Sequence, residues 1–461
     1  MAFSLIDKTP DAVPITLVAK ERFAQWCAEA CESERNWLAA TGFAAEPGAC
    51  ALVPDENGRV GRVVVGLGGE REPGAALWAL AGLPDALPDG NYRLATVPAG
   101  LDQSHLALGW ALATYAFDRY HARKRKATAL IWPEGADRGR VLALARAVFL
   151  VRDLANTPAG DLGPCELADK AAEVAGRTGA DYRVIVGDEL LAENYPTIHT
   201  VGRASTRAPR LVDIRWGDPA APRVTLVGKG VCFDTGGLDL KTASGMRLMK
   251  KDMAGAAIVL GLGQAIIETG LALRLRVLLP LVENAVSGNA MRPLDIVRTR
   301  KGLTVEIGNT DAEGRLILCD ALAEAATEKP ALLVDVATLT GAARVAVGPE
   351  LGALFSNDDG LAAALVEAGM AEDDPLWRLP LWRPYRRMID SKVADLNNVA
   401  ESPYAGAVVA ALYLQEFVEP GIPWAHLDVM AWNQRNRPGR PEGAEATGLR
   451  ALYAHIERRF G

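Results

Sequence analysis

The amino-acid sequence predicts an α/β protein with two domains, a smaller N-terminal α/β domain and a larger C-terminal α/β domain whose central mixed sheet is flanked by helices. The first observation behind this prediction is length, because 461 residues exceed what one hydrophobic core usually organises. The second is alternation, since apolar strand-like runs are followed by segments with helical spacing. The third is an asymmetry: the motifs that could carry chemistry all lie in the C-terminal part.

Residues 1–135 form the expected N-terminal domain. The hydrophobic pattern predicts strands at residues 14–20, 60–67, 92–97 and 128–132, and helices at residues 21–40 and 104–120. Residues 66–71 begin like a dinucleotide-binding fingerprint, but Arg71 stands where the third glycine should be, so a turn is the better interpretation. Because no chemical motif occurs in this part, we expect a non-catalytic domain.

Residues 136–461 form the expected C-terminal domain, which starts with a linker helix at residues 138–154. The pattern predicts strands at residues 210–216, 223–228, 273–282 and 331–337, and a long helix at residues 252–269. Ligands of open α/β sheets gather at the carboxyl ends of strands. Lys229, the stretch 309–316 and Thr338 each follow such a strand, so we expect them to lie near one another.

The stretch 309–316 carries two carboxylates and one guanidinium within five residues: Asp311, Glu313 and Arg315. A short strand pattern precedes it and a helical pattern follows it, so it lies at a strand-to-helix junction. The free N–H groups of a helix N-terminus favour negative charge there. Acidic residues are also ordinary helix starters, so this motif alone does not decide between a binding site and a helix cap.

A second cluster lies upstream and contains Lys229, Asp234, Lys241 and Asp252. Gly228 and Lys229 invite a nucleotide-binding interpretation, but a P-loop would need glycine where Arg223 stands and serine or threonine after the lysine. The alternative is that Lys229 binds a metal, which requires loss of its proton beside nearby cations. Asp252 has a plainer alternative as a helix cap.

The two clusters together hold four acidic side chains: Asp234, Asp252, Asp311 and Glu313. Four carboxylates brought together without cations would repel one another and raise one another's pKa values. Two divalent cations would offset that repulsion, and mostly oxygen ligands with one amine suit Mg, Mn or Zn without choosing between them. Two metals roughly 3.5–4 Å apart can activate a water for hydrolysis.

Other kinds of site lack their parts in this sequence. Neither a Gly-x-Ser-x-Gly nor a His-Glu-x-x-His motif occurs, and the five histidines lie outside the clusters. A net charge of −7 gives no electrostatic case for nucleic acid. We expect no membrane span and no signal peptide, and the six scattered cysteines favour reduced thiols in the cytoplasm.

The two clusters, in this order, resemble the leucyl aminopeptidase family M17, and residues 309–316 match its signature at every position. The resemblance implies a dinuclear metal-dependent aminopeptidase that removes the N-terminal residue of peptides. It implies metal ligands at Lys229, Asp234, Asp252, Asp311 and Glu313. It further implies catalytic roles for Lys241 and Arg315, the latter with a bicarbonate, and a side-chain pocket at Met249, Thr338, Leu339 and Gly341.

The resemblance also implies two Mn or Zn ions per subunit, with Mg as a further candidate, a homohexamer and a cytoplasmic location. Four places depart from the family pattern: Thr235, Leu294, the loop 401–406 and residues 446–448. The loop could alter the pocket, so a preference for leucine does not follow. Two alternatives remain open, a non-catalytic scaffold that kept the fold and a two-metal phosphoesterase, although phosphoesterase sites usually recruit histidine.

Overall fold

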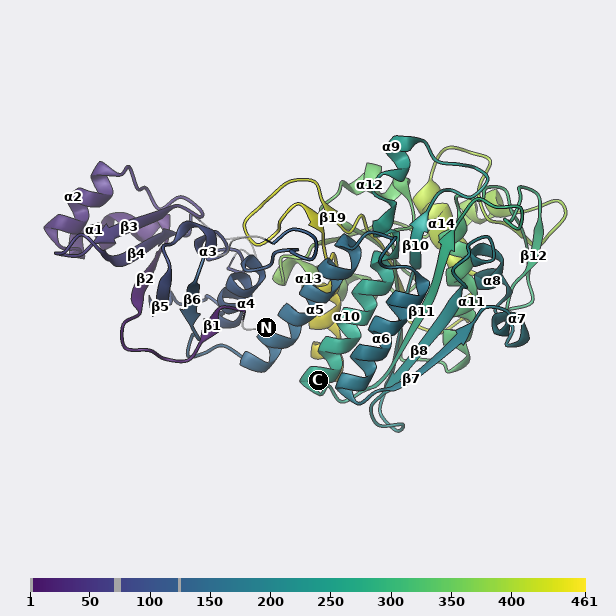
Figure 1. Cartoon of the computed structure of the whole chain (residues 1–461), viewed down its shortest axis with the longest axis horizontal. Helices are drawn as coiled ribbons and strands as arrows, with labels where there is room; N and C mark the ends of the chain where they lie inside the picture. Colours follow the sequence, from purple (N-terminus) through teal and green to yellow (C-terminus); the bar gives the residue numbers. More distant parts are fainter. Residues whose placement is uncertain (1–2, 70–75, 123–125) are drawn as a thin grey trace. The chain divides into compact units, whose positions relative to one another are not determined.

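The computed structural model describes residues 3–69, 76–122 and 126–461 (Figure 1). The chain divides into two compact units. The first contains residues 1–145, 371–373 and 435–442, and the second contains residues 146–370, 374–434 and 443–461. The division falls within helix α5 (Arg138–Asn156). The α/β class and the two-domain organisation predicted from the sequence are confirmed.

The first unit is built on a six-stranded sheet in the order β1-β6-β5-β2-β4-β3. All neighbouring strands run parallel except β3 and β4, which are antiparallel. Its elements are β1 (Leu5–Ile6), β2 (Val13–Val18), η1 (Lys20–Arg22), α1 (Phe23–Glu29), α2 (Glu32–Ala40), β3 (Cys50–Pro54), β4 (Val60–Gly66), α3 (Leu83–Ala86), β5 (Gly90–Thr96), α4 (Gln103–Ala113) and β6 (Thr128–Ile131).

Two predicted helices of this unit differ from the structure. The helix expected at residues 21–40 is broken at Ala30, whose extended backbone separates α1 from α2. The helix expected at residues 104–120 ends at Ala113, so its last seven residues were assigned wrongly. Asp102 caps its start, since its carboxylate accepts a hydrogen bond of 2.7 Å from the Ser104 N–H. Of the turn expected at residues 66–71, residues 70 and 71 lie outside the described part of the chain.

The second unit is built on a mixed nine-stranded sheet in the order β16-β15-β18-β14-β9-β11-β8-β7, with β10 paired to β11. Its strands are β7 (Asp181–Val186), β8 (Arg210–Trp216), β9 (Arg223–Gly228), β10 (Gly230–Asp234), β11 (Arg274–Asn284), β14 (Leu332–Ala337), β15 (Gly352–Ser356), β16 (Leu376–Arg378) and β18 (Trp424–Asp428). The central strands β18, β14, β9 and β11 run parallel, and so does β10 beside β11. Their carboxyl ends therefore meet at one edge of the sheet.

Helices cover both faces of this sheet, and Figure 1 shows α6 and α10 on one side of the strands and α8 and α11 on the other. The helices are α6 (Pro164–Thr178), α7 (Glu189–Ala192), α8 (Pro196–Gly202), α9 (Ala243–Met246), η2 (Met249–Met253), α10 (Ala254–Thr269), α11 (Glu313–Thr327), α12 (Gly341–Val347), α13 (Asp359–Ala371), η3 (Arg383–Ile389), α14 (Gly406–Gln415) and α15 (Leu449–Phe460). Short strands outside the main sheet are β12 (Ile296–Arg298), β13 (Thr304–Glu306), β17 (Leu396–Asn397), β19 (Trp432–Asn433) and β20 (Gly443–Ala444).

Helix α10 is the core helix of the second unit. The segment Met249–Thr269 is long and apolar enough to cross a membrane, but 89% of its apolar window is buried inside the protein, as expected of a core helix. Its start packs tightly against the sheet at Gly255, where an added Cβ would lie 2.2 Å from the Val336 carbonyl oxygen. This close approach brings the start of α10 to the ends of β9 and β14.

One buried ion pair of this unit predicts a pH-dependent stability. Arg152 lies 3.0 Å from Glu445, and Asn433 donates a hydrogen bond of 2.7 Å to the same carboxylate. Burial alone would raise the pKa of Glu445, but Arg152 and Arg450 outweigh it and lower that pKa to about 2. A depressed folded-state pKa stabilises the protein above the unfolded value, and this contribution disappears as the pH falls from about 4.5 through 2.

We therefore expect Glu445→Gln to lower the free energy of unfolding by about 3 kcal/mol at pH 7. The gap between variant and wild type should close as the pH approaches 2. Urea denaturation midpoints of both proteins across this range measure the gap. A gap that stays constant with pH would show that Glu445 does not act through its charge.

Candidate metal centre

The candidate residues gather at the edge where the parallel strands end. Lys229 follows β9, Asp234 ends β10, and Thr338 follows β14. Asp252 lies in η2 immediately before α10, while Glu313 begins α11. The prediction that Asp252 opens the long helix is therefore off by two residues, because Asp252 lies in the 3₁₀ segment and α10 begins at Ala254. These positions fit the rule that sites of α/β sheets form beyond the carboxyl ends of strands.

Three acidic side chains form a compact buried cluster. Asp234, Asp252 and Glu313 each contribute one oxygen, and these oxygens all lie within 4.8 Å of one another. The three residues are between 1% and 3% exposed. Carboxylates this close and this dry need compensating positive charge.

Two lysines of the chain supply positive charge beside these carboxylates. The Lys229 Nζ atom lies 2.7 Å from Asp252 Oδ2 and 3.0 Å from Glu313 Oε1. The Lys241 Nζ atom lies 2.8 Å from Asp234 Oδ2 and also pairs with Asp311 Oδ1. The structure thus brings all four acidic candidates and both lysines into one network.

The carboxylates perturb one another as the sequence suggested. Burial, reinforced by Asp234, raises the pKa of Glu313 to about 8 and that of Asp311 to about 6. Burial works to lower the pKa of Lys229, but Asp252 and Glu313 outweigh it and raise that pKa above its ordinary value. These shifts express the cost of unneutralised negative charge in a buried site.

The donor set fits divalent cations. Asp252 Oδ2 and Glu313 Oε1 are buried, and both face the Lys229 Nζ atom at 2.7 and 3.0 Å, so these oxygens converge on one point of the cluster. Oxygen donors of this kind suit Mg, Mn or Zn, and a deprotonated Lys229 would add one nitrogen. Binding of a metal by Lys229 would require loss of its proton.

Several residues that the sequence analysis did not single out hold the candidates in place. Asn284, at the end of β11, donates a hydrogen bond of 2.9 Å to Asp234 Oδ1. Asn398 accepts a hydrogen bond of 2.8 Å from the Gly308 N–H and donates one of 2.7 Å to the Asn309 carbonyl, which fixes the start of the 309–316 loop. Ordinary asparagines far away in the sequence carry no pattern that could have marked them.

Arg315 lies on α11 and is 7% exposed. Its guanidinium donates a hydrogen bond of 2.5 Å to the Asn398 carbonyl, while its Nε atom is buried without a hydrogen-bond acceptor. The Nε–H group of Arg315 can therefore donate a hydrogen bond to an anion that binds beside the carboxylate cluster.

All eleven candidate residues line one cavity of about 600 Å³. They are Lys229, Asp234, Lys241, Met249, Asp252, Asp311, Glu313, Arg315, Thr338, Leu339 and Gly341. None of the side chains that line it in the described structure is a histidine. The cavity therefore combines a charged end with an adjacent wall that includes Met249 and Leu339.

Thr338 joins the charged end to this wall. Its hydroxyl donates a hydrogen bond of 2.7 Å to Asp252 Oδ1, and its carbonyl accepts one of 3.1 Å from Lys229 Nζ. The next two residues are held by Asp428, whose Oδ1 atom accepts hydrogen bonds from the N–H groups of Leu339 and Thr340 at 2.9 and 3.2 Å. The pocket wall is thus tied to the carboxylate cluster through the end of one strand.

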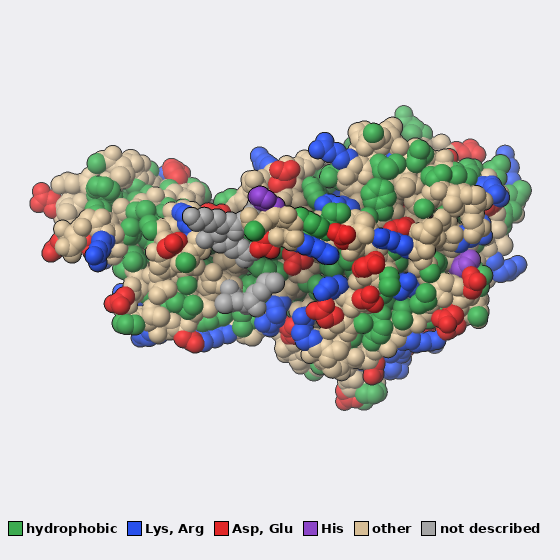
Figure 2. Space-filling model, in the orientation of Figure 1, with side chains coloured by type: hydrophobic (Ala, Val, Ile, Leu, Met, Phe, Trp, Pro, Cys, Tyr) green, Lys and Arg blue, Asp and Glu red, His purple; other side chains and the backbone are tan. Residues whose placement is uncertain are grey.

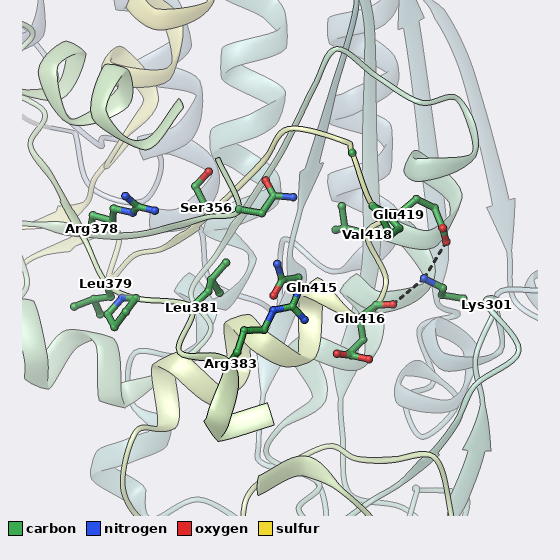
Figure 3. A pocket seen from close by; sticks show the side chains of 14 residues that line it. Lys301, Ser356, Arg378, Leu379, Leu381, Arg383, Gln415, Glu416, Val418 and Glu419 are labelled. Atoms are coloured by element: carbon green, nitrogen blue, oxygen red, sulfur yellow. Dashed lines mark hydrogen bonds and ion pairs between the residues drawn. The ribbon is translucent and has the colours of Figure 1, made fainter. Parts of the chain in front are cut away.

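A larger cavity of about 900 Å³ lies elsewhere in the second unit (Figure 3). Lys301 contributes to its wall, where it pairs with Glu419 at 2.9 Å and donates a hydrogen bond to the Glu416 carbonyl at 2.9 Å. None of the eleven candidate residues lines it. Its size alone does not make it the site of chemistry.

Gly314 shapes the cluster because it has no side chain. A Cβ atom at this position would lie 2.5 Å from Lys229 Cε and 2.7 Å from its Nζ atom. Lys229 is already held between Asp252, Glu313 and the Thr338 carbonyl, so it could not move without losing a partner.

We expect Gly314→Ala to weaken metal binding by about 10- to 100-fold, because the new methyl group displaces a candidate ligand. Metal titration followed by calorimetry measures this loss. Gly176→Ala in α6 is the matched control, because nothing lies within 4 Å of the atom it adds. Equal affinity in Gly314→Ala and wild type would argue against a ligand role for Lys229.

The site is a buried carboxylate cluster with two lysines and an arginine, and it lies beyond the carboxyl ends of a mixed α/β sheet. This combination is typical of metal-dependent hydrolases. Comparison with known proteins identifies the family of hydrolases. Residues 149–453 match the catalytic domain of the cytosol aminopeptidase family, and residues 13–133 match the N-terminal domain of M17 aminopeptidases. The chain belongs to the M17 cytosol aminopeptidase family and is a metal-dependent aminopeptidase.

Relatives and solved structures agree with this assignment. The chain is 39% identical over 425 residues to a probable cytosol aminopeptidase of Syntrophotalea carbinolica, with 86% of this chain and 85% of the relative covered. It is 42% identical to peptidase B of Pectobacterium atrosepticum, with 79% and 88% covered. The crystal structure of cytosol aminopeptidase from Coxiella burnetii matches all of both chains at 44% identity and a TM-score of 0.95. The bottromycin maturation enzyme BotP in complex with Mn matches at 36% identity and a TM-score of 0.89, with 98% and 100% covered.

Proposed function

We propose that this aminopeptidase holds two divalent cations at Lys229, Asp234, Asp252, Asp311 and Glu313 and uses them to hydrolyse the first peptide bond of its substrates. The observation that carries the proposal is that these five side chains, with Lys241 and Arg315, line one cavity. When bound, such a pair of cations activates a water and polarises the scissile carbonyl. The substrate's free amino group would bind at the same centre, which restricts cleavage to N-terminal residues.

The other two charged residues have separate tasks in this proposal. Lys241 keeps an ammonium group beside Asp234 and Asp311, where it stabilises negative charge that develops on the carbonyl oxygen. Arg315 has a buried Nε atom without an acceptor and would bind a bicarbonate that serves as general base. The absence of histidine among the lining residues of the described structure makes such a helper chemically useful.

The metal is proposed to be Mn or Zn, with Mg as a further candidate, because oxygen-rich ligand sets accept all three. The Mn complex of BotP supports manganese. Metal-stripped protein reloaded with each ion, and assayed on aminoacyl amides, tests the proposal. We expect metal-dependent release of the N-terminal residue and no turnover of a phosphate monoester. Failure to release any residue with any metal, in a protein that remains folded, would favour the scaffold alternative.

We further propose a cytoplasmic homohexamer in which residues 1–135 form a non-catalytic domain and residues 136–461 the catalytic one. The relatives' name, cytosol aminopeptidase, supports the location. Exposed apolar side chains on the second unit support assembly, including Trp377, Trp382 and Val393, which are 59%, 55% and 64% exposed. On the face that Figure 2 shows, acidic and basic side chains are interspersed rather than gathered by sign. Sedimentation velocity tests the assembly, and a monomer at micromolar concentration would contradict it.

A further inference from the structure

Two basic side chains on the wall of the catalytic cavity have no partner within the described chain. Lys251 lies in η2 between Lys250 and Asp252 and is 5% exposed, yet it belongs to the cavity lining. Arg344 lies on α12 and also lines the cavity. Its NH2 atom lies 3.8 Å from where a Cβ of Gly341 would be, so its guanidinium stands next to a pocket residue. Neither side chain forms an ion pair or hydrogen bond with any residue that the structure describes.

Each of the other lysines around the site, Lys229, Lys241 and Lys250, has a polar partner within the protein. Lys229 and Lys241 pair with carboxylates of the cluster. Lys250 donates a hydrogen bond of 2.5 Å to the Asn156 carbonyl and lies 5.6 Å from the centre of the Trp432 ring. Lys251 therefore differs from them, because a buried ammonium group without a counter-charge is costly to keep.

The protein's own acidic groups near Lys251 are already committed. Asp252 pairs with Lys229 through Oδ2 and accepts the Thr338 hydroxyl through Oδ1. Asp428 accepts the N–H groups of Leu339 and Thr340 through Oδ1, and the Thr340 hydroxyl at 2.6 Å through Oδ2. A negative charge that satisfies Lys251 must therefore enter the cavity with a ligand.

The rest of this wall suits an amino-acid side chain with a short apolar stem. The apolar side chains of Met249, Leu339, Val429 and Met430 line the same cavity as Lys251 and Arg344. Small groups at Gly341 and Ala342 leave room beside Arg344. A carboxylate at the end of one or two methylene groups would place its stem against the apolar residues and its charge at Lys251 and Arg344.

We propose that Lys251 and Arg344 make this pocket selective for substrates whose N-terminal residue is acidic, aspartate or glutamate. The inference rests on the proposed function, because it takes the wall beside the metal centre as the pocket for the first side chain. Lys251 is buried whereas Arg344 is exposed, so discrimination against the neutral isostere depends chiefly on Lys251, whose buried charge a neutral ligand leaves unpaired.

The matched substrate pairs are glutamyl and glutaminyl amides, and aspartyl and asparaginyl amides, with a leucyl amide as apolar reference. On the metal-loaded wild type at neutral pH, we expect kcat/KM for the acidic member to exceed that for its amide by about 30-fold or more. Equal values within each pair, with the leucyl amide cleaved best, would overturn the proposal while leaving the aminopeptidase function intact.

The variant that isolates the charge is Lys251→Met, which keeps the length of the side chain. It should lose most of the preference for glutamyl over glutaminyl amide while the leucyl amide is cleaved at least as well. Lys250→Met is the matched control. It removes the same charge from the neighbouring residue, whose side chain does not line the cavity. A parallel loss for glutamyl and leucyl amides in Lys251→Met would mean a structural role and would overturn the proposal.

A binding measurement separates this proposal from the catalytic one. Calorimetric titration of the metal-loaded protein with free glutamate and free glutamine should show tighter binding of glutamate, and the difference should vanish in Lys251→Met. If no amide is hydrolysed but this difference is present, the catalytic proposal fails and the pocket assignment stands. If glutamate and glutamine bind equally to wild type, the pocket assignment fails whatever the activity.

Discussion

Glu313→Gln should abolish both tight metal binding and turnover while the chain stays folded. Glu313 is 1% exposed, and its Oε1 atom lies 3.0 Å from the Lys229 Nζ atom, so the carboxylate already faces a positive charge at the centre of the cluster. The amide in the variant keeps the volume but removes the charge, and an amide is a far weaker ligand for a divalent cation. We expect the metal affinity to fall by at least about 100-fold and the aminopeptidase activity to fall below detection.

The measurement is thermal unfolding with and without Mn. A cation that binds only the folded state raises the midpoint of wild type, and this rise should be lost in the variant. Glu306→Gln is a matched control, because Glu306 lies in β13 and contacts Ser391 outside the cavity lining. Retained activity in Glu313→Gln, or a metal-induced rise equal to that of wild type, would contradict the proposed ligand set.

The sequence was sufficient for the charged residues of the site. Lys229, Asp234, Asp252, Asp311 and Glu313 follow or precede strongly apolar segments whose type is easy to predict. Lys229 follows β9 and Asp234 ends β10, and both strands run parallel to β11, so their carboxyl ends meet at one edge of the sheet. Asp311 and Glu313, up to 84 positions from Lys229, line the same cavity, although β13 before them belongs to a separate three-stranded sheet. The resemblance to the family, and not the strand-end rule, accounts for that part of the prediction.

The residues that hold the site in place could not be predicted in the same way. Asn284, Asn398 and Asp428 reach the site through a strand end or a loop, and each acts by hydrogen bonds to a particular oxygen or N–H group. Such bonds depend on side-chain directions that neither periodicity nor composition encodes. Strand β10 (Gly230–Asp234), which pairs in parallel with β11, was likewise not among the predicted strands.

The position of Lys251 in the cavity wall could not be predicted from the sequence either. In the sequence it is one of two adjacent lysines before Asp252, and such pairs are ordinarily solvated. Only the fold shows that the first is engaged by a carbonyl and an aromatic ring while the second is buried in the cavity wall. Specificity is therefore read from packing rather than from the motif that carries the chemistry.

Lys241→Met should separate catalysis from metal binding. The Lys241 ammonium group pairs with both Asp234 and Asp311, so it would share these two carboxylates with a bound cation. Removing it should leave the metal affinity unchanged or higher. If the ammonium group stabilises negative charge on the carbonyl oxygen, kcat should fall by about 100- to 1,000-fold with little change in KM.

Calorimetry with Mn and steady-state kinetics on one aminoacyl amide measure the two effects separately. Lys241→Arg is the conservative comparison, because it restores positive charge and should recover part of kcat if charge is what matters. A variant that loses metal and activity together would place Lys241 among the residues that hold the metal centre, and a variant with normal kcat would remove it from the mechanism. Lys241 thus decides whether this cavity only binds cations or also stabilises the charge that hydrolysis creates.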